Sequence, residues 1–319
     1  MEAKALRTRL RKSFSRQGII LLIYYGMMNF CVALVAAVDA VIFALSSGTP
    51  SMDAVLERVA GNGWGYIVTC VLGGIALLLW KKKDFCFRTI WQRGNPLRIG
   101  SFFAITAIFL SGQLVFQLLA VVLEWLLNLV GLSLMESMQA ASASADTLSM
   151  FLYMGLFAPV FEEILFRGLI LRSLEPFGKK FAIFASAYLF GIFHGNLIQS
   201  PYAFAVGLVL GYVAMEYNIG WAMVLHMINN LILGDSLVRL TSCLDTALSD
   251  LIFWAITLGC AIASVVIFIR KRAEIAEYFR SGRIHPLCLK CFFTSPGVLA
   301  ITAVMAANML LMLLLPLIG

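Results

Sequence analysis

The sequence predicts an all-α protein, a polytopic bundle of transmembrane helices. Hydrophobic residues make up 61% of the 319 residues, and the mean hydropathy is +0.92. The apolar residues form long runs that short basic segments separate. Soluble domains usually contain about 45–50% apolar residues, so lipid must be the solvent for most of this chain. No useful period-two alternation, the pattern of a transmembrane barrel, is present.

Nine segments qualify as membrane spans, because a helix needs roughly 20 apolar residues to cross the hydrocarbon core. The first apolar stretch is too long for a signal peptide, so we interpret it as an uncleaved span. The nine spans are residues 18–46, 63–80, 99–130, 148–171, 181–195, 202–217, 219–239, 251–269 and 297–318.

The placement of basic residues agrees with nine spans and a cytoplasmic N-terminus. All Lys and Arg residues except Arg58 and Arg239 then fall in cytoplasmic segments, as the positive-inside rule requires. The net charge of +7 therefore marks topology, and we expect no nucleic-acid partner. The four basic clusters are Lys4 to Arg16, Lys81 to Arg98, Arg167 to Lys180 and Arg270 to Lys290.

Two adjacent glutamates and an arginine lie within the fourth span. Each ionisable residue inside a membrane costs about 2.5–3.5 kcal/mol on insertion scales and usually marks function. Glu163 and Arg167 are four residues apart, so they can pair on one helix face. Glu162 points roughly 100° away without a local counter-charge, which suits a general base. A purely structural ion cluster that locks two helices is the alternative.

Two histidines lie in predicted spans. His194 lies in span five, and His226 lies in span seven with Asn230 one turn further along the same face. At 1.5 Å rise per residue, both histidines and Glu162 can meet at one depth in the cytoplasmic half. Such a group can activate water and stabilise an oxyanion. It can equally form a zinc site of His, His and Glu, and spacing does not choose between the two.

The ordered motifs resemble the CPBP family of intramembrane peptidases. That family includes the endoprotease that trims prenylated CAAX proteins, and bacterial relatives linked to bacteriocin immunity and peptide maturation. The glycines of Gly207-Leu-Val-Leu-Gly211 also resemble the family's small-residue helix, where glycines permit close packing. The matching motifs are Glu162-Glu163-xxx-Arg167, Phe190-xxx-His194 and His226-xxx-Asn230.

The resemblance implies a role for each motif residue. Glu162 would be the base that activates water, with Glu163 and Arg167 as structural support. His194 would position the water or the substrate carbonyl, and His226 and Asn230 would form the oxyanion hole. A glutamate mechanism implies no cofactor, whereas a zinc ion would be held by Glu162, His194 and His226. The family commonly has about eight spans, so eight is the alternative to nine.

We therefore expect an intramembrane endopeptidase with a membrane-embedded or lipophilic peptide substrate, located in a bacterial plasma membrane. Two other functions stay open: a non-catalytic immunity or sensor-partner protein, and a proton-coupled transporter. The chain divides into an N-terminal basic segment with three spans (1–147), a CPBP-like catalytic core (148–239) and C-terminal spans with a cytoplasmic loop (240–319).

The last cytoplasmic loop carries His285, Cys288 and Cys291. Their spacing could supply half of a zinc site, but a fourth ligand is missing nearby. We interpret the cysteines as a reduced pair without function.

Overall fold

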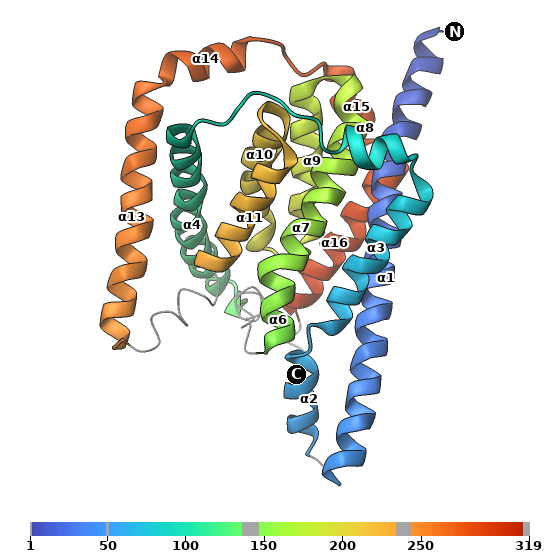
Figure 1. The fold of residues 1–319 in the computed structure, drawn as a ribbon, viewed down its shortest axis with the longest axis vertical. Coiled ribbons are helices and arrows are strands. Elements are labelled where there is room, and N and C mark those ends of the chain that lie inside the picture. The colour runs from blue at the N-terminus through green and yellow to red at the C-terminus, as the bar shows by residue number, and fades with distance from the viewer. Residues whose placement is uncertain (1, 49–50, 136–146, 234–243, 315–319) are drawn as a thin grey trace.

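The computed structural model describes residues 2–48, 51–135, 147–233 and 244–314. Within these residues every regular element is a helix (Figure 1), which confirms the predicted all-α class. The two adjacent glutamates lie in one continuous helical run, Leu148–Phe177, which consists of α6, η2, α7, η3, α8 and η4. The other long helices are α1 (Glu2–Ser47), α3 (Trp64–Trp80), α4 (Ile99–Asn128), α9 (Lys179–Phe193), α10 (Gln199–Glu216), α11 (Ile219–Leu233), α13 (Thr246–Arg270) and α16 (Pro296–Leu314).

Each predicted span coincides with one of these helices or with the run Leu148–Phe177, apart from differences of a few residues at most ends. The exception is the first span, since α1 begins at Glu2 and so includes the basic segment that precedes residue 18. The last residues of two predicted spans, 234–239 and 315–318, lie outside the described residues, as does the predicted domain boundary at 239–240. Three connections contain helices that the sequence did not predict. The connection between α13 and α16 holds α14 (Arg272–Arg280) and α15 (Pro286–Phe293). The connection between α1 and α3 holds α2 (Met52–Ala60), and the one between α3 and α4 holds η1 (Phe85–Thr89).

Six helices of the described residues are long and apolar enough to cross a membrane. The helices α9, α10 and α11 are not among them, and the predicted histidines lie at the end of α9 and within α11. The count of nine spans therefore stays a prediction. The six are Lys4–Ser47, Met52–Trp80, Ile99–Asn128, Leu148–Phe177, Thr246–Arg270 and Pro296–Leu314.

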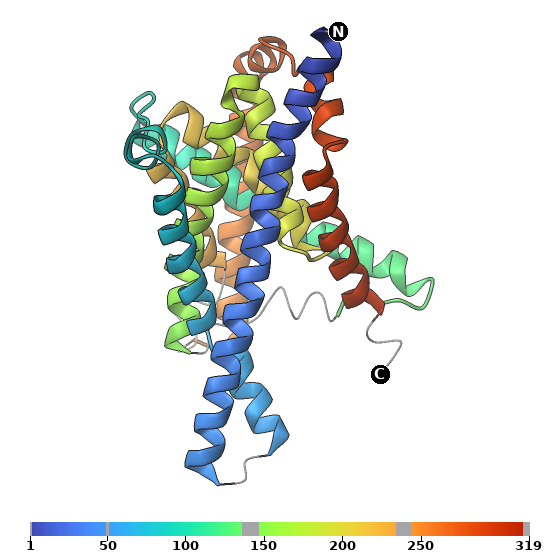
Figure 2. The same ribbon diagram turned by 90° about the vertical axis from the view of Figure 1, so that its right-hand side faces the viewer.

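The segments that carry the four basic clusters lie at one end of the bundle (Figures 1 and 2). The N-terminus, the connection between α3 and α4, the turn at α8, and α14 with α15 are all found there. This is the arrangement that the positive-inside rule requires of a single membrane side. The cytoplasmic identity of that side stays a prediction.

The bundle has three groups of helices. The run Leu148–Phe177 and the helices α9, α10 and α11 form the centre, where α9 packs along α10. The helices α1, α3 and α16 pack together on one side, and α4 pairs with α13 on the other (Figure 1). Phe166, Phe190 and Leu210 of the central helices are fully or almost fully buried. The histidine-bearing helices are thus shielded on both sides.

Helices α1 and α16 approach each other closely at two glycines. A Cβ on Gly18 would overlap the backbone at Gly297, and a Cβ on Gly297 would overlap the backbone at Ser15. The Gly297 N–H donates to Ser15 Oγ at 2.8 Å. Small residues at such a crossing let two backbones meet, as in other membrane bundles.

Substituting Gly18 by alanine should separate α1 from α16 and lower the free energy of unfolding by about 1–3 kcal/mol, as overpacking does. Gly26→Ala on the same helix is the matched control, since a Cβ there meets no atom within 4 Å. Alanine forms helix better than glycine, so the control should be neutral or slightly more stable. Thermal unfolding in detergent measures both, and equal melting temperatures would contradict the close approach.

Candidate active site

The run that carries the glutamates departs twice from α-helical geometry. Tyr153–Phe157 (η2) and Ile164–Leu171 (η3) are π-helical turns, which are rare and frequently occur at functional sites. In the first turn the Ala158 N–H donates to the Tyr153 carbonyl, five residues back. The next donor in that register would be residue 159, but Pro159 has no N–H. The Met154 carbonyl is therefore left for another donor.

Glu163 and Arg167 form the predicted ion pair. Arg167 Nη1 donates to Glu163 Oε1 at 2.8 Å, and neither side chain is exposed to solvent. Arg167 Nη2 also donates to the Gly207 carbonyl of α10 at 3.3 Å. The guanidinium lies over the ring of Phe190 in α9, 4.2 Å from its centroid. The pair thus joins its own helical run to α9 and α10.

The close approach of α10 to α9 beside Arg167 is possible because Gly207 has no side chain. A Cβ there would lie 3.1 Å from Ala187 Cα in α9, closer than packed side chains normally come. The predicted close packing of the small-residue helix is therefore confirmed between α10 and α9.

His226 of α11 lies between the two glutamates. Its Nδ1 is 3.0 Å from Glu163 Oε1, and its Nε2 is 3.8 Å from Glu162 Oε2. Because a carboxylate only accepts, Nδ1 carries a hydrogen and Nε2 is the atom turned to Glu162. The side chain of Glu162 is 22% exposed and that of His226 is 6% exposed. The counter-group of Glu162 thus comes from another helix.

His194 is placed by the end of its helix. It follows α9 directly, and Gly195 adopts a positive φ of 59°, the left-handed conformation that terminates helices. The side-chain oxygen of Asn196 then accepts from the N–H groups of Ile198 and Gln199 at the start of α10. His194 Nδ1 donates to the Phe190 carbonyl at 2.8 Å, which leaves Nε2 as the acceptor of the neutral ring.

The two imidazoles share one aromatic neighbour. Phe190 meets His194 edge-on at 4.8 Å between ring centroids, and His226 edge-on at 5.7 Å. Phe190 thus links the two histidines, and His226 in turn faces Glu162.

Asn230 reaches the same helical run one turn beyond His226. Its Nδ2 donates to the Met154 carbonyl at 2.9 Å, the group that Pro159 leaves without a helical donor. Its Oδ1 accepts from Asn229 Nδ2 at 3.2 Å, and Asn229 Oδ1 accepts from the Tyr202 hydroxyl at 2.7 Å. This polar chain fixes the orientation of the Asn230 amide.

Tyr202 and the Met154 carbonyl were missed from the sequence. The only available signal for the carbonyl was the proline at position 159, whose effect depends on the register of a π-helical turn. Tyr202 gave no signal beyond a hydroxyl within an apolar run.

The described residues contain no cluster of ligands for the alternative, a zinc site. Among the described residues, no three or more His, Cys, Asp or Glu side chains lie close enough together to hold a metal ion. The set Glu162, His194 and His226 is therefore too open to share one ion as placed.

The Cys288 thiol is also a poor ligand, because burial raises its pKa and keeps it protonated. His285 caps α15 through Nδ1, which accepts from the Leu287 N–H.

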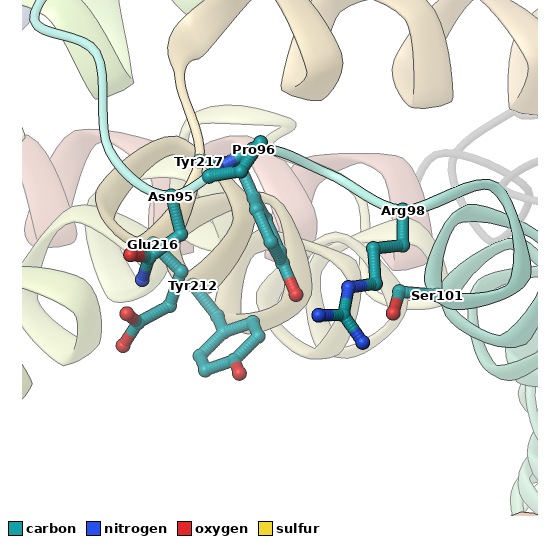
Figure 3. A pocket seen from close by; sticks show the side chains of 7 residues that line it. All are labelled: Asn95, Pro96, Arg98, Ser101, Tyr212, Glu216 and Tyr217. Carbon is teal, nitrogen blue, oxygen red and sulfur yellow. The ribbon is translucent and has the colours of Figure 1, made fainter.

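A separate hollow of about 300 Å³ lies between the start of α4 and the end of α10. None of the predicted site residues lines it. Figure 3 shows Arg98 and Ser101 on one side, with Tyr212, Glu216 and Tyr217 on the other. The Glu216 carboxylate pairs with Lys179 at 2.6 Å.

Comparison with known proteins agrees with the motifs. No curated protein and no solved structure matches the chain. One family matches, described as Type II CAAX prenyl endopeptidase Rce1-like, over residues 144–232. Together with the long apolar helices, this match indicates an integral membrane protein. The matched segment holds all six residues predicted to form or support the site. Over this segment the chain is similar to the family that its ordered motifs predicted.

Proposed function

We propose that the chain is an intramembrane endopeptidase that hydrolyses a peptide bond in a membrane-associated peptide or protein. The proposal rests on one observation: Glu162 Oε2 lies 3.8 Å from His226 Nε2. The groups of helices on both sides of the central group hold these two side chains in place. A partly exposed carboxylate beside an imidazole can activate water and bind the charge that develops on a carbonyl oxygen.

Glu162 acts as the general base. Its carboxylate takes a proton from a water molecule as the water oxygen attacks the carbonyl carbon of the scissile bond. His194 Nε2 accepts the second hydrogen of that water, because Nδ1 is committed to the Phe190 carbonyl. The water oxygen then faces the substrate between two acceptors, which is the orientation that attack requires.

His226 stabilises the oxyanion from Nε2. Since Nδ1–H is bonded to Glu163, a hydrogen on Nε2 requires the doubly protonated ring. In that state Arg167 and His226 balance the charges of Glu162 and Glu163, so the buried group is neutral overall. The Asn230 amide has two N–H groups and uses one on the Met154 carbonyl. Its second N–H is the other donor to the oxyanion.

The protonated Glu162 then completes the reaction. It gives its proton to the nitrogen of the leaving amine as the carbon–nitrogen bond breaks. The products are a carboxylic acid, whose hydroxyl keeps the second hydrogen of the water, and an amine, and Glu162 returns to its charged form. Glu163 and Arg167 take no part in proton transfer; they fix the tautomer and the orientation of His226.

The substrate is proposed to be a lipophilic or membrane-embedded peptide. The matched family is named for endopeptidases of prenylated CAAX proteins. In a bacterial plasma membrane, the proposed location, a lipophilic peptide precursor or a membrane protein is the corresponding substrate. The proposed catalytic core is residues 148–239, between the segments 1–147 and 240–319.

Glu162→Gln should abolish hydrolysis, because the amide cannot accept the proton of water. Removal of a general base costs about 10²–10⁴-fold in rate. Glu124→Gln is the matched control, since Glu124 is also a carboxylate on an apolar helix, but it accepts from Asn128 on its own helix and from Ser133 and Leu134 in the loop that follows. Mass spectrometry of membrane peptides from cells carrying each variant measures the cleavage.

The same pair of variants separates the peptidase from a non-catalytic protein. A cellular phenotype that survives Glu162→Gln, in a variant that inserts normally, would overturn the proposed peptidase and favour an immunity or sensor-partner role.

Metal dependence has its own test. Activity of the purified protein should survive prolonged incubation with a strong chelator, because the proposed base is a carboxylate and no metal-bound water is required. Loss of activity that added zinc restores would replace this mechanism with a metal-dependent one.

A further inference from the structure

One aromatic side chain from outside the Rce1-like segment contacts both the helix that bears Glu162 and the helix that precedes His194. Tyr24 belongs to α1, and it is only 9% exposed. Its ring stacks on Phe161 with a centroid distance of 5.0 Å and an angle of 28° between the planes. It also stacks on Phe193 at 5.9 Å and 30°.

The two partners of Tyr24 are the direct chain neighbours of the proposed catalytic residues. Phe161 precedes Glu162 on α7, and Phe193 precedes His194 at the end of α9. One ring from α1 is therefore placed between the helix that bears the base and the helix that bears its histidine.

Helix α3 holds the Tyr24 ring in this orientation. The Tyr24 hydroxyl contacts Cys70 Sγ at 3.9 Å. One turn further on, Gly73 leaves room for the stacked pair, since a Cβ there would lie 3.2 Å from the Tyr24 ring and overlap Phe161. The ring is thus confined from α3 while it contacts α7 and α9.

We propose that Tyr24 is a positioning residue of the peptidase site, whose ring sets the spacing between Glu162 on α7 and His194 on α9. The inference rests on the proposed function. It assigns a part of the site to α1, which lies outside residues 144–232. An aliphatic side chain of smaller area would let the two helices approach or tilt. Glu162 and His194 would then no longer hold one water molecule between them.

The test compares Tyr24→Leu, Tyr24→Phe and wild type in the full-length protein. Tyr24→Leu should lower kcat about 10-fold or more, since displacement of reacting groups by about 1 Å can cost 10²-fold, while KM changes by less than about 2-fold. Tyr24→Phe retains the ring and should keep kcat within about 2-fold of wild type. Ile23→Ala, at a neighbouring side chain that is 67% exposed, is the control and should leave kcat unchanged.

The pH profile separates positioning from a general loss of structure. A smaller folded fraction scales kcat/KM at every pH, whereas displaced groups move the pH limits of the profile. We expect the acid limb of Tyr24→Leu to move by about half a pH unit or more. Wild-type kcat in Tyr24→Leu overturns the inference, as does an unmoved profile. Equal impairment in Tyr24→Phe overturns it too, because the hydroxyl would then be the group that acts.

If Tyr24→Leu does not fold, a second variant tests the same inference. Gly73→Ala leaves Tyr24 intact but displaces Phe161, and it should give the same loss of kcat with the same shift of the acid limb; an unmoved profile again overturns the inference. Glu162→Gln in the same assay separates the two proposals. Hydrolysis that persists in Glu162→Gln, or that is missing in wild type, overturns the peptidase and the role of Tyr24 together. An inactive Glu162→Gln beside a fully active Tyr24→Leu overturns only the role of Tyr24.

Discussion

A carboxylate that is sealed from solvent must find its hydrogen bonds within the protein, and Glu163 finds them on two different elements. One oxygen accepts from Arg167 on its own helical run and from His226 on α11. Arg167 in turn donates to the Gly207 carbonyl of α10 and covers the ring of Phe190 in α9. Four elements are therefore held by one buried charge pair, and the orientation of His226 depends on it. Removing one member of a buried pair commonly costs 3–5 kcal/mol, because the other charge is left without a partner.

The same arrangement explains why two adjacent glutamates do different things. One oxygen of Glu163 is fixed between two donors, Arg167 and His226, so its charge serves to orient a histidine. Glu162 points to a partly exposed position and faces the far nitrogen of that histidine, at 3.8 Å. A single imidazole thus separates a structural carboxylate from one that is proposed to react.

Sequence reasoning was sufficient wherever the determinant is local. Helix spacing predicted the Glu163–Arg167 pair, and apolar runs predicted the long helices. The glycines of the small-residue helix predicted close packing without naming the partner, which at Gly207 is α9. It was insufficient where a contact joins distant segments. The contact of His226 with both glutamates depends on how α11 meets α7, and Tyr24 reaches the site across the bundle from α1. The bond from Asn230 to Met154 depends on a π-helical turn that ends at a proline, which no periodicity reveals.

The helices that hold the two histidines are short. The 15 residues of α9 rise about 22 Å at 1.5 Å per residue, whereas the hydrocarbon core is roughly 30 Å thick. A hydrophobic mismatch of this kind is relieved by local thinning of the bilayer. Thinning would bring the polar headgroup layer toward the depth of His194, at the end of α9. The proposed hydrolase needs a supply of water within lipid, and thinning at the short helices would give water a route that a full-length span would close.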